Sequence, residues 1–166
     1  DFSMSLGYYD NRKNGEWVES RYVCKFMDVP YQSNDASNNY PVIRYADVIL
    51  MYAETLNQNG KTAEACKYLN MTRRRGFGYQ TTETTPVDLH TTDKATFALM
   101  VEQERRVELA FENHRWFDLI RTGRAVEVLK SKGFSLNETN LICPIPQKQI
   151  DVNPGLTQNQ YVIEPK

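Results

Sequence analysis

The sequence predicts a mainly α-helical protein: a helical hairpin, further helices with long loops, and an extended Pro-rich C-terminal strap. Apolar residues recur at helical spacing in residues 43–56, 62–75 and 93–112. Gly or Asn-Gly follows several of these segments, as is typical of helix ends. The tail contains four prolines, which disfavour regular helix there: Pro144, Pro146, Pro154 and Pro165.

Composition excludes several classes of protein. The chain has 166 residues, 40% of them hydrophobic, and a formal net charge of -1, so no electrostatic footprint for nucleic acid is present. No apolar run is long enough to predict a membrane-spanning helix. Three widely spaced cysteines and two histidines predict neither a disulfide framework nor a metal site, and we expect no cofactor: Cys24, Cys66, Cys143, His90 and His114. Because the chain opens on Asp1, we expect it to be part of a longer protein.

Residues 1–40 form an aromatic segment of loops and short strands. Asn14-Gly15 is a strong signal for a two-residue hairpin turn. Alternating residues over 21–26 predict a strand. The segment is therefore expected to differ from the helical remainder, residues 41–166.

The helical remainder opens with two helices joined by a tight turn. Over residues 43–56, ten of fourteen residues are apolar, and Arg44, Asp47 and Glu54 share one narrow stripe, which predicts a mostly buried helix with a polar seam. Asn59-Gly60 ends it, and the next helix runs to the arginines 73–75. The pair measures about 34 residues, the length of a tetratricopeptide unit. The three arginines match the negative end of the helix dipole, which we favour over a nucleic-acid patch.

Residues 77–92 are Thr-rich and predict a loop. Thr92 or Asp93 is expected to cap a helix over about 93–112. Shorter helices are expected over 116–120, with Trp116 in the core, and over 124–132, with a turn at 147–150 in the strap.

Glu104 and Glu108 fall on an apolar face of the helix at 93–112. The apolar residues of that face are Phe97, Met100, Val101, Val107 and Phe111, and Arg105 lies mostly off it. Buried carboxylates need cationic partners, and the expected ones are Arg44, Arg115, Arg121 and the arginines 73–75. A catalytic carboxylate pair is the alternative, but it faces a cleft, and neighbouring arginines lower carboxyl pKa values, contrary to what a general acid needs. We therefore predict structural ion pairs and no catalytic residues.

Four segments together resemble one known family. They are RYADVILMYAETLNQNG at 44–60, LNMTRRRGF at 69–77, ERRVELAFENHRWFDLIRTG at 104–123 and PIPQKQIDVNPGLTQNQ at 144–160. In this order they are similar to the C-terminal part of SusD/RagB proteins, so residues 41–166 are expected to form a SusD/RagB-like C-terminal helical domain. The resemblance implies a surface-exposed lipoprotein of the Bacteroidota outer membrane that captures glycans or other nutrients. It also implies a SusC-like TonB-dependent transporter as partner, and a lipid anchor and N-terminal helices outside this chain.

The first forty residues are the predicted place for glycan contacts. Flat aromatic rings pack on the apolar face of a sugar, and four such side chains lie near amides and charges: Tyr8, Tyr9, Trp17 and Tyr22. The alternative is that these rings cover the helices. Two other functions stay open, a tetratricopeptide-like protein-interaction module and, third, a glycoside hydrolase. An exposed groove around Arg44, Asp47 and Glu54 would favour the interaction module.

Overall fold

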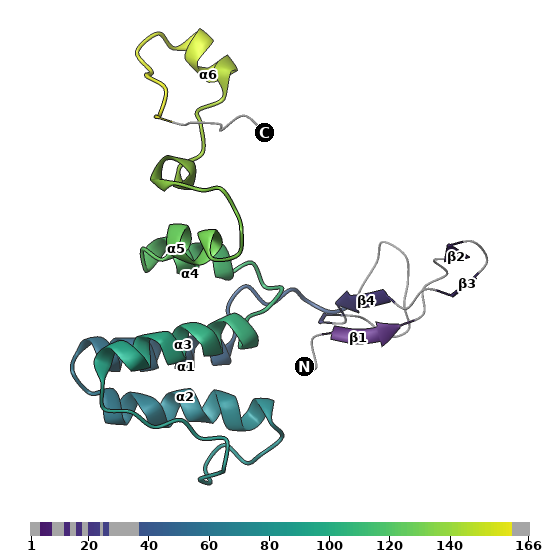
Figure 1. Cartoon of the computed structure of the whole chain (residues 1–166), viewed down its shortest axis with the longest axis vertical. Helices are drawn as coiled ribbons and strands as arrows, with labels where there is room; N and C mark the ends of the chain where they lie inside the picture. The colour runs from purple at the N-terminus through teal and green to yellow at the C-terminus, as the bar shows by residue number, and fades with distance from the viewer. Residues whose placement is uncertain are drawn as a thin grey trace. The chain divides into compact units, whose positions relative to one another are not determined.

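The computed structural model describes residues 37–160, four short strands before them, and residues 25–26. The described part is mainly helical (Figure 1). It divides into two compact units, Asp1–His114 and Arg115–Lys166. The predicted boundary at residue 40 rests on composition and stays a prediction.

Two antiparallel strand pairs lie in the first segment. Strands β1 (Met4–Gly7) and β4 (Ser20–Val23) pair with Met4 opposite Val23. Strands β2 (Arg12–Lys13) and β3 (Glu16–Trp17) pair antiparallel before and after Asn14-Gly15, as the predicted hairpin requires. The strand predicted over 21–26 is shorter than expected, because residues 25–26 already form a turn.

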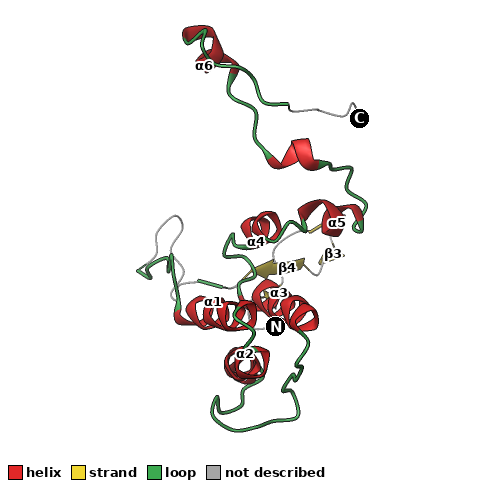
Figure 2. Cartoon of the chain, turned by 90° about the vertical axis from the view of Figure 1, so that its left-hand side faces the viewer, coloured by secondary structure: helices red, strands yellow, loops and turns green. Residues whose placement is uncertain are grey.

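Three helices build the core of the first unit. They are α1 (Tyr45–Gln58), α2 (Thr62–Gly76) and α3 (Lys94–Glu108), and each packs against the other two. In the view of Figure 2 they lie side by side with their axes nearly toward the reader. Their contact buries an apolar cluster: Leu50, Ala53, Leu56, Ala65, Cys66, Leu69, Phe97 and Val101. Cys66 is a free cysteine, and its thiol is buried in this cluster.

The loop between α2 and α3 is held by polar side chains of α2. Asn70 bonds both backbone groups of Leu89, at 2.9 Å each. Arg74 makes two hydrogen bonds to Asp88, which hold the pKa of that carboxyl well below its usual value. Asp93 caps α3 by accepting from the backbone N–H of Thr96 at 2.6 Å. The predicted cap is thus confirmed, and the arginines of α2 serve the fold.

The second unit contains shorter helices. These are α4 (Arg115–Arg121), α5 (Ala125–Lys130), a 3-10 turn η1 (Glu138–Leu141) and α6 (Gln147–Val152). Trp116 and Phe117 are 39% and 67% exposed, so the prediction that Trp116 lies in the core was wrong; Leu119 is buried instead. The strap is not simply extended, because Gln158 bonds both backbone groups of Ile145 at 2.9 Å and closes a loop around α6.

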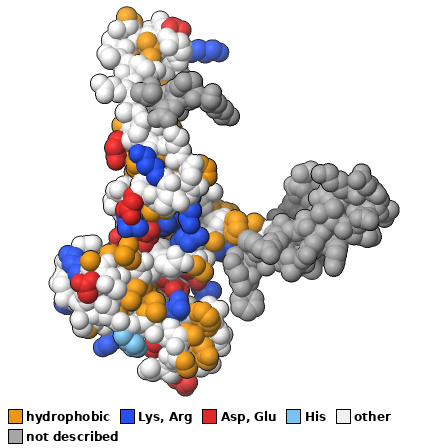
Figure 3. All heavy atoms as spheres, in the orientation of Figure 1, with side chains coloured by type: hydrophobic (Ala, Val, Ile, Leu, Met, Phe, Trp, Pro, Cys, Tyr) orange, Lys and Arg blue, Asp and Glu red, His pale blue; other side chains and the backbone are white. Residues whose placement is uncertain are grey.

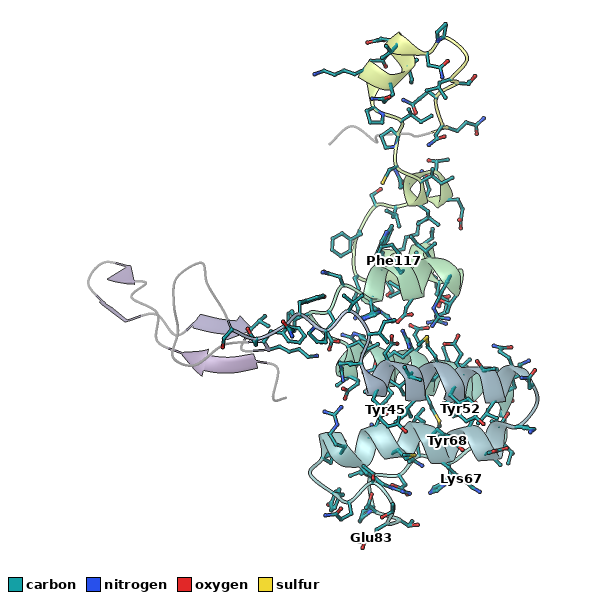
Figure 4. All side chains as sticks on the ribbon, turned by 180° about the vertical axis from the view of Figure 1, so that it is seen from behind. Tyr45, Tyr52, Lys67, Tyr68, Glu83 and Phe117 are labelled. Carbon is teal, nitrogen blue, oxygen red and sulfur yellow. The ribbon has the colours of Figure 1, made fainter. Side chains whose placement is uncertain are left out.

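One face of α1 stays open to solvent. Tyr45, Val48 and Met51 are 73%, 43% and 43% exposed, at helical spacing on one face. The prediction of a mostly buried helix is therefore wrong on this side, since α2 and α3 cover only the opposite face. Tyr52 of the same face is 46% exposed and meets Tyr68 of α2 edge to face, with ring centroids 4.7 Å apart (Figure 4).

This open face predicts self-association of the isolated chain. Exposed apolar patches promote association, and a charge in their centre opposes it. In sedimentation equilibrium we expect the wild-type chain to associate with rising concentration and Met51→Lys to shift the equilibrium toward monomer. Val152→Lys is the control, because Val152 is 77% exposed on α6. A wild-type chain that stays monomeric at all concentrations would contradict this prediction.

Candidate functional site

The buried face of α3 differs from the predicted one. Phe97, Val101 and Glu104 are buried, at 0%, 3% and 8% exposure, whereas Val107 and Phe111 are about half exposed, at 52% and 51%. The helix ends at Glu108, and Phe111 takes a positive φ of 65°, so the helical spacing does not continue to residue 112. The face buries charged residues as well as apolar ones.

Arg105 belongs to this buried face, contrary to expectation. Its side chain and that of Asp47 on α1 are 5% and 7% exposed, and Nη1 lies 2.7 Å from Oδ1. The pair joins α1 to α3 inside the core. Asp47 is therefore part of a buried seam rather than a groove, and Arg44 and Glu54 are only partly exposed.

Glu112 is the most enclosed of the carboxylates at the end of α3. Its side chain is only 2% exposed and accepts two hydrogen bonds from Arg44, at 2.7 and 2.8 Å. Lys25 lies 2.5 Å from the same carboxylate. Removing either cation leaves a buried charge short of partners, which is costly.

The two cations also satisfy the end of α3. Lys25 Nζ donates to the carbonyls of Glu108 and Ala110 at 2.9 and 3.0 Å, and Arg44 Nη2 donates to the carbonyl of Glu108 at 2.6 Å. The last carbonyls of a helix have no intrahelical partner, and the helix dipole favours cations there. This chemistry explains why the chain between α3 and residue 114 holds a fixed path.

Glu108 and Glu104 extend the cluster toward α2. The Glu108 carboxylate lies 2.5 Å from Arg44 Nη1 and 2.5 Å from Arg75 Nη2. Glu104 lies 3.1 Å from Arg73 Nη1. We call these seven side chains the carboxylate cluster: Lys25, Arg44, Arg73, Arg75, Glu104, Glu108 and Glu112.

The predicted partners are divided between the two units. Arg44, Arg73 and Arg75 lie in the cluster, whereas Arg115 and Arg121 belong to α4 in the second unit. There Arg121 Nε donates to Asp118 at 2.9 Å. Asp118 is buried, so this pair serves the second unit.

Burial and pairing move two of the carboxyl pKa values in opposite directions. Burial raises the pKa of Glu104 above its ordinary value of 4.5, and the arginine beside it offsets only part of this effect. The expected net lowering of the Glu104 pKa was therefore wrong, because burial outweighs the effect of Arg73. Burial also acts on Glu112, but hydrogen bonds from Arg44 and Lys25 outweigh it and the pKa is lowered.

The arrangement of the cluster suits structural ion pairing better than cleavage of a glycosidic bond. A glycosidase places one proton-donating acid and one free carboxylate on opposite sides of a substrate. Here each carboxylate is engaged by at least one cation, and two share the same arginine. This geometry favours the structural interpretation of Glu104 and Glu108.

A pocket of about 380 Å³ adjoins the cluster between α1 and α2. It is lined by the first turns of α1, the last turns of α2 and one loop residue: Arg44, Tyr45, Ala46, Ile49, Met71, Thr72, Arg75 and Thr81. Tyr45 lies at this end of α1 in Figure 4. Arg44 and Arg75, which line the pocket, also form ion pairs with Glu108.

The predicted sugar-contacting aromatics fall in the first segment. Trp17 lies in β3 opposite Arg12, and Tyr22 lies in β4 opposite Ser5. Tyr8 and Tyr9 are outside the described residues. Their role stays a prediction.

Sequence reasoning missed Glu112, Lys25 and Thr72. Glu112 lies inside the motif at 104–123, but it follows the end of α3, where helical periodicity gives no information. Lys25 lies 85 residues before Ala110 in the sequence, and no local pattern reveals a contact over that separation. Thr72 was missed because no feature of the sequence distinguishes it from the other buried residues of α2.

Over the described residues, no helix is long and apolar enough to cross a membrane, and no group of His, Cys, Asp or Glu is placed to hold a metal ion. Figure 3 shows acidic and basic side chains interspersed on the described part of the face in view. The fold and the paired carboxylates define a tetratricopeptide-like helical protein with a charged, buried seam.

Comparison with known proteins identifies the family. The sequence profile of the SusD family matches residues 2–139, and the chain belongs to this family. It is 33% identical to SusD-like protein P38 of Formosa agariphila over 92% of this chain and 30% identical to SusD-like protein P25 of that organism over 96%. It spans 30% and 31% of the length of those two relatives.

A solved structure agrees with the sequence relatives. The crystal structure of a SusD homolog from Bacteroides thetaiotaomicron superposes with a TM-score of 0.66 at 31% identity. The match covers 78% of this chain and 30% of that one. The predicted family and the mainly helical fold class are thereby confirmed.

The opposite pKa shifts predict opposite effects on acid stability. A lowered pKa means that the unfolded chain binds the proton first, so Glu112 makes the fold less stable as pH falls through about 4.5. A raised pKa means that the folded chain binds the proton first, so Glu104 makes the fold more stable as pH falls from its raised pKa toward about 4.5. The free energy of unfolding is measured in urea from pH 7 to 4. As the pH falls, it should decrease less in Glu112→Gln than in the wild type, and more in Glu104→Gln. Identical pH slopes in all three proteins would show that the cluster is not linked to protonation.

Proposed function

We propose that this chain is part of a cell-surface lipoprotein that captures a nutrient glycan and delivers it to a SusC-like TonB-dependent transporter. The observation that carries the proposal is membership of the SusD family, matched over residues 2–139. Family membership supports a role in glycan binding and nutrient uptake. Localisation at the outer membrane, the transporter partner and the delivery step are parts of the same proposal.

The geometry of the carboxylate cluster supports binding without hydrolysis. Each of its carboxylates is held by an arginine or lysine, and all lie at the junction of three helices. We therefore propose that Glu104→Gln changes the free energy of unfolding and has no effect on glycan hydrolysis. We propose no catalytic residue in this chain.

We place the sugar contacts of this proposal in the first segment. Aromatic rings suit the apolar face of a pyranose, while nearby amides and charges suit its hydroxyl groups. The candidates are Tyr8, Tyr9, Trp17 and Tyr22. Strand pairing at Trp17 and Tyr22 supports a fixed backbone for such contacts.

Binding to immobilised polysaccharides tests this proposal. A panel of neutral and acidic glycans in affinity electrophoresis should retard the wild-type chain on at least one of them. Trp17→Ala should weaken that retardation about tenfold, because an aromatic anchor carries much of the binding energy. Tyr79→Ala is the matched control, since Tyr79 is 45% exposed in the loop after α2 and should leave binding unchanged.

Two outcomes of this experiment oppose the proposal. Retention that is equal in the wild type and Trp17→Ala would remove the aromatic segment from the site. Release of reducing ends by the wild-type chain, lost in Glu104→Gln, would replace capture by hydrolysis.

A tetratricopeptide-like protein-interaction module is the second candidate. The observation that favours it is the open apolar face of α1, where Tyr45, Val48 and Met51 are exposed. Burial of Asp47 disfavours the polar groove that this alternative expected. Interaction through the open face is compatible with nutrient capture, since a protein that delivers a ligand to a transporter also needs a protein interface.

A further inference from the structure

Residues 87–91, just before α3, lie along α2 and are contacted through their main chain. On α2, Cys66, Asn70 and Arg73 follow one another at spacings of four and three residues, so their side chains form one stripe. The stripe contacts the carbonyls of every second residue of the segment, in reversed order: Thr91, Leu89 and Val87. We call residues 87–91 the clasped segment.

The contacts of the stripe resemble those of a neighbouring β-strand. Asn70 Nδ2 donates to the Leu89 carbonyl, and Asn70 Oδ1 accepts from the Leu89 N–H, both at 2.9 Å. An antiparallel strand bonds both main-chain groups of one residue in the same way. Arg73 Nε donates to the Val87 carbonyl at 2.6 Å, and Cys66 Sγ lies 3.5 Å from the carbonyl of Thr91. Asn70 is 1% exposed, so water does not compete for its bonds.

The lengths of the helix and of the clasped segment agree. Seven residues of α-helix, from position 66 to 73, rise about 10 Å. Four steps of extended chain, from position 91 to 87, span at most about 14 Å. An extended peptide therefore keeps pace with the stripe and turns alternate residues toward it.

Two side chains of the segment add to the main-chain contacts. Leu89 packs against the apolar cluster of the three helices. Asp88 accepts two hydrogen bonds from Arg74, and its side chain is 1% exposed. His90 is exposed. Most of the recognition is thus of extended backbone, the mode in which main-chain hydrogen bonds supply the affinity for a peptide.

The loop before the clasped segment extends away from these contacts. Arg74 closes its base, since Nη1 donates to the Thr81 carbonyl at 2.9 Å and Nε donates to Asp88 at 2.8 Å. Residues 82–84 are exposed, and Glu83 lies at the tip of the loop (Figure 4). The tip connects α2 to the segment but lies outside the stripe.

We propose that α2 is a peptide-binding helix whose ligand is the chain's own residues 87–91. Asn70 and Arg73 hold this extended segment, and the loop around Glu83 only tethers it. Because Arg73 also pairs with Glu104 of α3, the stripe connects the clasped segment to the carboxylate cluster. The proposal is independent of nutrient capture, since all of these contacts lie within the first unit.

Cutting the tether in the full chain tests the proposal. A recognition sequence for a specific protease is inserted after Thr82, and hydrogen exchange at the Leu89 amide is measured before and after cleavage. We expect this amide to stay protected after the cut, because its acceptor is the side chain of Asn70 rather than part of the loop. The two pieces, residues 1–82 and 83–166, should elute together in size-exclusion chromatography.

Asn70→Ala shows whether the stripe provides this protection. In the cut chain it should raise the exchange rate of the Leu89 amide about tenfold or more, because both hydrogen bonds to that residue are lost. Asn59→Ala is the matched control: it removes the same amide group from the exposed C-cap of α1 and should leave the rate unchanged.

Circular dichroism of each variant shows whether its helices are retained. If Asn70→Ala unfolds, Arg73→Met replaces it and should raise the same rate, since it removes the donor to Val87. Glu104→Gln is then the control, because it changes the other partner of Arg73 and leaves the bond to Val87 in place.

Two results overturn the proposal. Loss of Leu89 protection when the wild-type chain is cut would show that the loop holds the segment. Protection that is unchanged by Asn70→Ala, or by Arg73→Met in its place, would show that apolar packing of Leu89 holds it without the stripe.

Discussion

The fold of the first unit depends on the buried carboxylate of Glu112 and the two cations that neutralise it. Arg44 is the N-cap of α1, Lys25 follows β4, and Glu112 lies just after α3, so one ion-pair group joins three separate parts of the chain. The same cations satisfy the last carbonyls of α3, which would otherwise lack partners. Buried charges are costly unless their partners are in place, so an arrangement of the helices that separated these groups would be disfavoured.

The same arrangement shapes the adjoining pocket. Arg44 and Arg75 both bind Glu108 and both line the cavity between α1 and α2, so the cluster and the pocket share their arginines. Carboxylates that neutralise arginines are poorly suited to cleave a glycosidic bond.

Local patterns predicted the elements well and their long-range partners poorly. The helical spacing, Asp93 as a cap and Asn14-Gly15 as a hairpin signal each act over a few residues, and the structure contains the helices, the cap and the paired strands before and after Asn14-Gly15. Extending the α3 pattern past Glu108 failed because two residues there take positive φ, and this error hid Glu112. Of the predicted arginines, Arg44, Arg73 and Arg75 lie in the cluster, whereas Arg115 and Arg121 lie in the second unit. Which of many arginines meets a buried carboxylate is fixed by packing, and sequence spacing does not contain that information.

A double-mutant cycle on Arg44 and Glu112 tests the central claim most directly. The free energy of unfolding in urea is measured for the wild type, Arg44→Met, Glu112→Gln and the double variant. Each single change should cost about 3–5 kcal/mol, because it leaves a buried charge with too few partners. The double variant should cost less than the sum, by about 0.5–3 kcal/mol, the range for residues in contact. Costs that are additive within about 0.5 kcal/mol, or single changes below about 1 kcal/mol, would contradict the account.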